Sequence, residues 1–207
     1  MTDIAIENLY RDFVGADDLK ILTKRFSITE FVGNWQQVMT SISTQIMGTG
    51  ITFSSVNATY ELQNDGNLSV LNSAYNGKLE KIFIQGVSRK RNQLDTCRTV
   101  KFDGLDFEGD YWLFYVSEAH DTVLVAAPLI IPIPLIPICI TGKLGLYVLT
   151  KDRDAFWTNP KRIAEIQTVL KKYGFDSFYN FPIFSGKSIP IADPLLGASV
   201  SNNKVNL

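Results

Sequence analysis

The sequence has almost none of the residues from which metal and nucleophilic sites are built. Its 207 residues include one histidine, His120, and two cysteines, Cys97 and Cys139. A metal centre normally needs three or four ligands, and a Ser-His-Asp or Cys-His site would have to use His120. We also find no glycine-rich phosphate loop. The sequence therefore predicts a protein that is not an enzyme and that has no metal and no cofactor.

An excess of positive charge is missing as well. Lys and Arg number 20, Asp and Glu number 21, and the net charge is -1. A nucleic-acid partner requires a basic surface to neutralise phosphates, so we expect none. The chain is instead rich in flat apolar side chains, because 12% of its residues are aromatic, with 13 Phe and 8 Tyr. This composition favours a β-rich fold.

The first residues do not read as a secretory signal. Residues 1–24 mix acidic and basic side chains and lack an apolar central segment. We therefore expect an intracellular or a membrane- or assembly-associated protein rather than a secreted one, unless a leader has been removed. Cys97 and Cys139 could form at most one disulfide, and the missing signal favours free thiols.

The pattern of apolar residues divides the chain. Residues 1–30 form a loosely amphipathic arm, which predicts one or two helices. Short alternating runs follow, and Asp65-Gly66 between two of them is a strong hairpin signal. Eight up-and-down antiparallel strands can close into a barrel that holds one small ligand, although a sandwich is possible on spacing alone. The runs that we interpret as these strands are 33–40, 57–63, 68–75, 80–88, 97–103, 110–117, 122–127 and 144–150.

An amphipathic helix follows the last predicted strand. Pro160 suits the first position of a helix and Gly174 suits its end, which predicts a helix over 160–173. Only one stripe of this helix is apolar, so it should lie against the outside of the barrel. Residues 183–207 predict an extended C-terminal tail.

The order of elements and several motifs resemble the lipocalin family. Gly33-Asn34-Trp35 matches the Gly-x-Trp motif of the family's first strand, and NATYELQNDGNLSVLN (57–72) matches its second and third strands. DYWLFYVSEAHDTVLVAAP (110–128) is similar to the sixth and seventh strands, and LYVLTKD (146–152) to the eighth. The nearest branch contains apolipoprotein D and the bacterial lipocalins. The resemblance implies one lipocalin-like barrel with its closing helix over 31–182.

The resemblance also implies packing roles for Gly33, Trp35 and Lys151. In the family, the Trp of the first strand faces inward at the closed base, and an Arg after the eighth strand packs over it. Lys151 stands at the position of that Arg. Its stem can cover Trp35, but an ammonium stacks less well than a planar guanidinium. Arg153 could substitute for it.

Candidate ligand-binding residues follow from the alternation of side chains along barrel strands. With Trp35 facing inward, its inward neighbours should be Gln37 and Met39. In the resembled branch the Trp of the sixth strand lines the cavity. The residues predicted to bind a ligand are Gln37, Met39, Tyr60, Trp112, Phe114 and Val116. Gln37 could hold a polar head group or be satisfied by a neighbour, and aromatic side chains could instead fill the barrel completely.

An apolar, proline-rich insert separates the last two predicted strands. Residues 122–142 carry no charge, but four prolines between 128 and 137 exclude a membrane-spanning helix. The insert, 129–141, either folds onto the arm or a barrel end, or exposes an apolar surface to a membrane or a protein partner. The residues that would make the latter contact are Leu129, Ile131, Ile133, Leu135, Ile136 and Ile138.

Two functions remain open from the sequence. The first is the binding or transport of a small hydrophobic or amphipathic ligand, such as a fatty acid or lysolipid, in the barrel. The second is a structural role, in which the arm, the insert and the tail hold neighbouring chains in an assembly. The sequence does not reveal the ligand or the oligomeric state.

Overall fold

The computed structural model describes the barrel, the arm and the closing helix. The described residues are 2–41, 54–76, 78–91, 93–106, 108–128, 144–175 and 180–182. The predicted insert 129–141 and the predicted tail 183–207 therefore lie outside the described residues. No helix in the described part of the chain is long and apolar enough to cross a membrane.

Eight antiparallel strands form a closed up-and-down barrel, as the sequence predicted. Each strand pairs with the next along the chain, and β1 closes the barrel by pairing with both β8 and β2. Asp65-Gly66 lies in the turn between β2 and β3, where Gly66 has a φ of 80° that favours glycine. The strands are β1 (Gly33–Ser41), β2 (Ser54–Leu62), β3 (Leu68–Tyr75), β4 (Lys81–Arg91), β5 (Leu94–Phe102), β6 (Glu108–Val116), β7 (Thr122–Pro128) and β8 (Leu144–Thr150).

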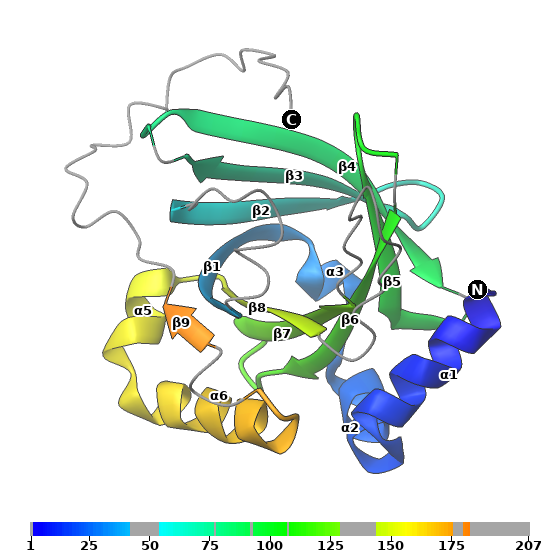
Figure 1. Ribbon diagram of the computed structural model, residues 1–207. Helices are drawn as coiled ribbons and strands as arrows, with labels where there is room; N and C mark the ends of the chain where they lie inside the picture. Colours follow the sequence, from blue (N-terminus) through cyan, green and yellow to red (C-terminus); the bar gives the residue numbers. More distant parts are fainter. Residues whose placement is uncertain are drawn as a thin grey trace, which may run out of the picture.

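The N-terminal arm is helical and packs on the barrel. Its helices are α1 (Asp3–Val14), α2 (Ala16–Arg25) and the short α3 (Ile28–Phe31). Figure 1 shows α1 and α2 beside β5 and β6. The Tyr10 hydroxyl donates a buried hydrogen bond of 2.7 Å to the Leu113 carbonyl of β6. The arm is thus part of the core of this chain.

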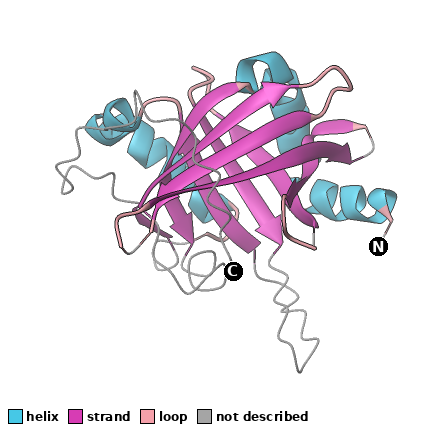
Figure 2. Cartoon of the chain, turned by 90° about the horizontal axis from the view of Figure 1, so that it is seen from above, coloured by secondary structure: helices cyan, strands magenta, loops and turns pink. Residues whose placement is uncertain are grey.

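The C-terminal helix also lies outside the barrel, as predicted. Helix α6 (Pro160–Lys172) begins at Asn159, whose side chain accepts a hydrogen bond from the Arg162 amide. It ends at Gly174, where a φ of +75° lets the Phe175 amide reach the Leu170 carbonyl. In Figure 2 the helices surround the strands.

Two short elements were not predicted. Helix α5 (Arg153–Thr158) precedes α6 and is capped by the Asp152 side chain. Strand β9 (Asn180–Pro182) pairs with the end of β1, at Met39–Ser41, beyond the point where β1 and β2 pair. Both depend on contacts with β1 that no local sequence pattern reveals.

The two ends of the barrel differ in their connections. The turns 63–67 and 117–121 lie at one end, together with α3, and we call this the closed end. The opposite ends of the strands form the open end, or mouth. Pro128 and Leu144, the strand ends that flank the predicted insert in the sequence, lie at this open end.

Contacts across the sheet identify the inner face of the barrel. Tyr60 on β2 and Tyr111 on β6 are separated by β3, β4 and β5 in the sheet, yet their hydroxyls lie 2.7 Å apart. Both side chains must therefore point inward. Residues directly opposite each other on paired strands share a face, so the strand register extends this assignment around the barrel. By that register Tyr147 also faces inward, and its ring lies near that of Tyr111.

Candidate ligand-binding site

Aromatic side chains seal the closed end. The Phe31 ring lies 4.6 Å from that of Tyr60 and 5.5 Å from that of Trp35. The Trp35 indole donates a hydrogen bond of 2.6 Å to the Phe31 carbonyl, and the Lys151 ammonium lies 5.3 Å from the centre of the Trp35 ring. The cavity beside Trp35 has a volume of only about 10 Å³, roughly that of one water. No room for a larger ligand exists in it.

Arg98 is an unusual part of the closed end. Its side chain is 0% exposed, and its guanidinium donates to the Ser88 hydroxyl and to the carbonyls of Ser88 and Gly66. Its Nη1 has no hydrogen-bond partner in the described structure, although the half-exposed Asp95 carboxylate lies 3.5 Å away. Burial lowers the pKa of Arg98. The contact with Gly66 directs this charge toward the β2–β3 turn and away from the mouth.

Further toward the open end, tyrosine side chains meet inside the barrel. Tyr60 and Tyr111 share their hydrogen bond, and the ring of Tyr147 is centred 6.5 Å from that of Tyr111. Burial raises the pKa of Tyr147 to about 12 and raises those of Tyr60 and Tyr111 as well. All of them are therefore neutral hydroxyls near neutral pH, and each can donate and accept a hydrogen bond.

The interior is accessible at this level. Tyr111 and Tyr147 lie within their strands and point inward, yet both are only half-buried. The same holds for other inward residues of the open half, Asn72, Ile84 and Phe102. Since these side chains point away from the outer surface, their accessible area lies on the inner face of the sheet, toward the open end. We call this part of the inner face the open half of the interior.

The residues predicted to bind a ligand divide between the two faces. By the strand register, Gln37, Tyr60 and Val116 face inward, and Gln37 is 5% exposed. Trp112 and Phe114 face outward, contrary to the prediction. Trp112 packs edge-on against Tyr10 of α1, and Phe114 contacts Phe13 of α1 together with Tyr173 and Phe175 after α6.

Met39 also faces outward, contrary to the prediction. The pairing of β1 with β8 shifts by one residue between Gln37 and Met39, and that of β6 with β7 shifts between Leu113 and Tyr115. A one-residue irregularity reverses the faces of all residues beyond it. It places Met39 opposite Val148 on the outer face, and it explains why Val116 points inward although Phe114 does not.

Tyr111, Tyr147 and Asn72 were missed by sequence reasoning. Tyr111 directly precedes Trp112, and neighbouring residues of a strand face opposite sides. Because Trp112 was predicted to face the cavity, Tyr111 was left on the outer face. The family resemblance, and not the alternation itself, chose the wrong face. A usable signal was the arm: its aromatic residues, such as Phe13, need an aromatic surface on the outside of the barrel.

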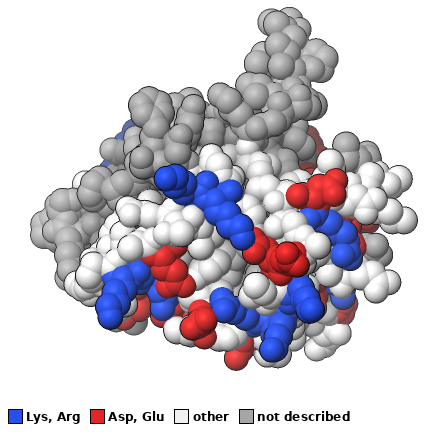
Figure 3. Space-filling model, turned by 90° about the horizontal axis from the view of Figure 1, so that it is seen from below, with Lys and Arg blue, Asp and Glu red and all other residues white. Residues whose placement is uncertain are grey.

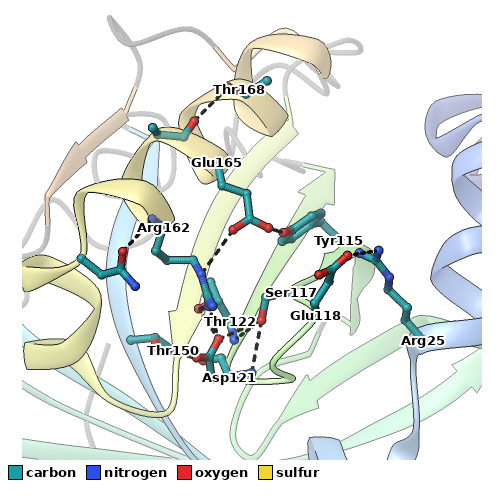
Figure 4. Close-up of polar contacts among 12 residues, drawn as sticks. Arg25, Tyr115, Ser117, Glu118, Asp121, Thr122, Thr150, Arg162, Glu165 and Thr168 are labelled. Carbon is teal, nitrogen blue, oxygen red and sulfur yellow. Dashed lines mark hydrogen bonds and ion pairs between the residues drawn. The ribbon is translucent and has the colours of Figure 1, made fainter.

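Polar contacts hold α6 and the arm against the closed end (Figure 4). The Arg162 guanidinium of α6 pairs with Asp121 in the β6–β7 turn and donates to the Thr122 hydroxyl. Burial alone would raise the pKa of Asp121, but the hydrogen bonds from Arg162 and Ser117 hold it below its usual range. Nearby, the Tyr115 hydroxyl donates to Glu165. These contacts fix the outer face and leave the interior free.

A second cavity lies outside the barrel, between α2 and α6, with a volume of about 200 Å³. Phe114 and Tyr115 line it, and its charged rim consists of pairs already made, Lys172 with Asp18 and Arg25 with Glu118. Figure 3 shows that acidic and basic side chains are interspersed on the face seen from below.

The two residue types that could carry chemistry have structural roles. His120 lies in the β6–β7 turn and contacts Glu30 at 2.7 Å, as a surface turn residue would. Cys97 is a buried free thiol beneath α1, and burial raises its pKa to about 12. A thiol with so high a pKa is a poor nucleophile. The described residues contain no cluster of His, Cys, Asp and Glu that could hold a metal.

The barrel is closed, its base is sealed, its open half is accessible and a helix packs outside it. Barrels of this class hold their ligands in the interior. Residues 26–129 match the model of the lipocalin-like domain. The chain therefore belongs to the lipocalin-like family. The assignment to the apolipoprotein D and bacterial lipocalin branch stays a prediction.

Solved structures share this fold at low sequence identity. Lobster apocrustacyanin A1 is 9% identical with a TM-score of 0.63, over 85% of this chain and 89% of that chain. The cockroach allergen Per a 4 is 14% identical with a TM-score of 0.54, over 79% and 91%. The siderocalin Ex-FABP is 11% identical with a TM-score of 0.51, over 76% and 95%. No curated protein matches the sequence.

Proposed function

We propose that this protein binds a small hydrophobic or amphipathic ligand in the open half of the barrel and carries it without chemical conversion. The observation that supports this most is the accessible inner surface at Tyr111, Tyr147 and Ile84. Apolar side chains there would supply about 25 cal/mol for each Å² of ligand surface removed from water. Fatty acids and lysolipids are the ligand classes that the sequence suggests.

The fold supports this proposal without identifying the ligand. Lipocalins bind small hydrophobic ligands, and structures similar in fold include the siderocalin Ex-FABP and an odorant-binding protein. Gln37 and Tyr60 face inward, where they can make polar contacts with a ligand, whereas Tyr115 bonds Glu165 outside the barrel. Tyr111 and Tyr147 are added to these polar contacts in the proposal.

The alternative is a structural role in an assembly, held by the arm, the insert and the tail. The arm packs against its own barrel through Tyr10, Phe13 and Leu22, and its other face exposes Ile4, Leu9 and Ile21. The insert and the tail lie outside the described residues. A contact of residues 129–140 with a membrane or partner is kept as a proposal, since the strand ends that flank the insert lie at the mouth, where a ligand would enter.

Blocking the interior tests the proposal. Ile84→Trp places a large ring on the inner face of β4, and Gln85→Trp places the same ring on the outer face one residue later. Titration with the fluorescent polyene diphenylhexatriene should show micromolar binding by the parent and Gln85→Trp proteins, and at least about tenfold weaker binding by Ile84→Trp. Native mass spectrometry of fresh protein would show any ligand carried through purification. Absence of probe binding by the parent, or equal binding by both variants, would contradict the proposal.

A further inference from the structure

The polar groups inside the open half indicate what kind of ligand it takes. The inward tyrosines Tyr111 and Tyr147 come from different strands and lie near each other there, and the hydroxyl of Tyr60 reaches Tyr111 from the closed end. Asn72 adds a side-chain amide on the inner face of β3, opposite Ala58 and Ile84. Its Oδ1 is buried and has no hydrogen-bond partner in the described part of the chain.

Charge is missing from this part of the interior. Among the described residues, the inner face of the open half consists of aliphatic, aromatic, hydroxyl and amide side chains, such as Thr40, Asn72, Ile84 and Tyr147. The one buried inward cation among them is Arg98, which pairs with Tyr111 in the sheet. Its guanidinium has no accessible surface and is bonded away from the tyrosine hydroxyls, to the carbonyls of Ser88 and Gly66 near the closed end. An ionised head group buried beside the tyrosines would lose its hydration without a charge to compensate it, which costs much more than burying an uncharged polar group.

We propose that the open half of the barrel selects a ligand whose buried end is an uncharged hydrogen-bonding group, such as an alcohol, ketone or amide, attached to an apolar body. The tyrosine hydroxyls would donate to this group or accept from it, and the apolar body would lie along Ile84 and Phe102. A charged amphiphile, including a fatty acid, would bind more weakly or with its head at the mouth. This inference rests on the proposed function and narrows its ligand class.

Three ligands with the same chain and different heads test the inference. Dodecanol, dodecanoic acid and dodecylamine are titrated as competitors of diphenylhexatriene, which has no polar head itself. At about pH 8 the acid and the amine are ionised, and dodecanol should compete at roughly tenfold lower concentration than either. The gap between dodecanol and dodecanoic acid should narrow at about pH 4, where part of the acid is neutral.

Tyrosine variants assign the effect to the interior. Tyr111→Phe and Tyr147→Phe should weaken dodecanol binding about threefold to tenfold, the usual effect of losing one hydrogen bond, and should weaken it more than they weaken the binding of diphenylhexatriene. Tyr115→Phe is the matched control, because it removes a hydroxyl that bonds Glu165 outside the barrel. It should leave the binding of every ligand unchanged.

The outcomes separate this inference from the proposed function. If diphenylhexatriene and all three competitors fail to bind, the proposed function is wrong, and the inference fails with it. If the probe binds but dodecanoic acid competes as well as dodecanol at about pH 8, the barrel is a carrier and the inference alone is overturned. A preference for the acid that disappears in Arg98→Met would move the head-group site to the closed end.

Discussion

The closed end and the open half of this barrel are built from similar residues, but side chains fill the closed end and leave the inner face of the open half accessible. At the closed end, the rings of Phe31, Trp35 and Tyr60 pack at tilted angles and leave about 10 Å³ beside Trp35. In the open half, Tyr111 and Tyr147 are also aromatic and inward, yet each keeps accessible surface. At the closed end, Phe31 of α3 packs on both Trp35 and Tyr60.

This contrast shows that aromatic content does not decide whether a small barrel is filled. Each buried aromatic side chain can remove roughly 150–250 Å² from water, so a few of them could plug the interior. Here the outer face takes several of the largest, including Trp112 and Phe114, because the arm and α6 need an aromatic surface to pack on. The helices outside the barrel thus help to keep its open half accessible.

The largest expected effect is a difference in the free energy of unfolding between two variants that remove similar side-chain volume at opposite ends of the barrel. Leu149→Ala acts at the closed end, where Leu149 is 4% exposed, and should cost about 3–5 kcal/mol because a new cavity forms. Ile84→Ala enlarges space that is already accessible and should cost only about 1–2 kcal/mol. Urea unfolding of both variants measures the difference. Equal losses would mean that the open half is as tightly packed as the base.

A smaller effect concerns the ion pair between Arg162 of α6 and Asp121 at the closed end. Because the folded pKa of Asp121 is held below its unfolded value of about 3.9, the contact contributes stability above that pH. The contribution is lost as the pH falls through the folded pKa. Asp121→Asn should therefore lower stability by up to about 1 kcal/mol at neutral pH, since Asp121 is partly exposed. The parent and the variant should converge in urea unfolding below about pH 3. A constant gap down to that pH would show that the charge of Asp121 plays no part.

The sequence predicted the strands better than it predicted the site. Alternation and the Asp65-Gly66 turn placed β2 and β3 correctly, and Pro160 and Gly174 marked the ends of α6 to within one residue. These are local signals, set by the period of each element and by backbone conformation at its ends. The family match then confirmed the barrel that they predicted.

The face of each side chain could not be predicted as well. Gln37 precedes the shift in β1, and Tyr60 lies in the regularly paired part of β2, after the shift between Ser54 and Asn57; both point inward as expected. Met39 lies beyond the shift in β1. A bulge of this kind depends on the pairing with β8, and nothing in the local sequence marks it. Trp112 was assigned to the wrong face because the family resemblance placed it in the cavity; its actual partners, Tyr10 and Phe13, are distant in sequence.

The central claim is that the barrel is sealed at one end and hollow at the other, and xenon tests it directly. Xenon enters apolar cavities in crystals under moderate pressure and marks them by its electron density. The account predicts xenon in the open half, in contact with Ile84 and within reach of the Tyr147 ring, and none beside Trp35. An interior without xenon, or xenon only beside Trp35, would contradict it.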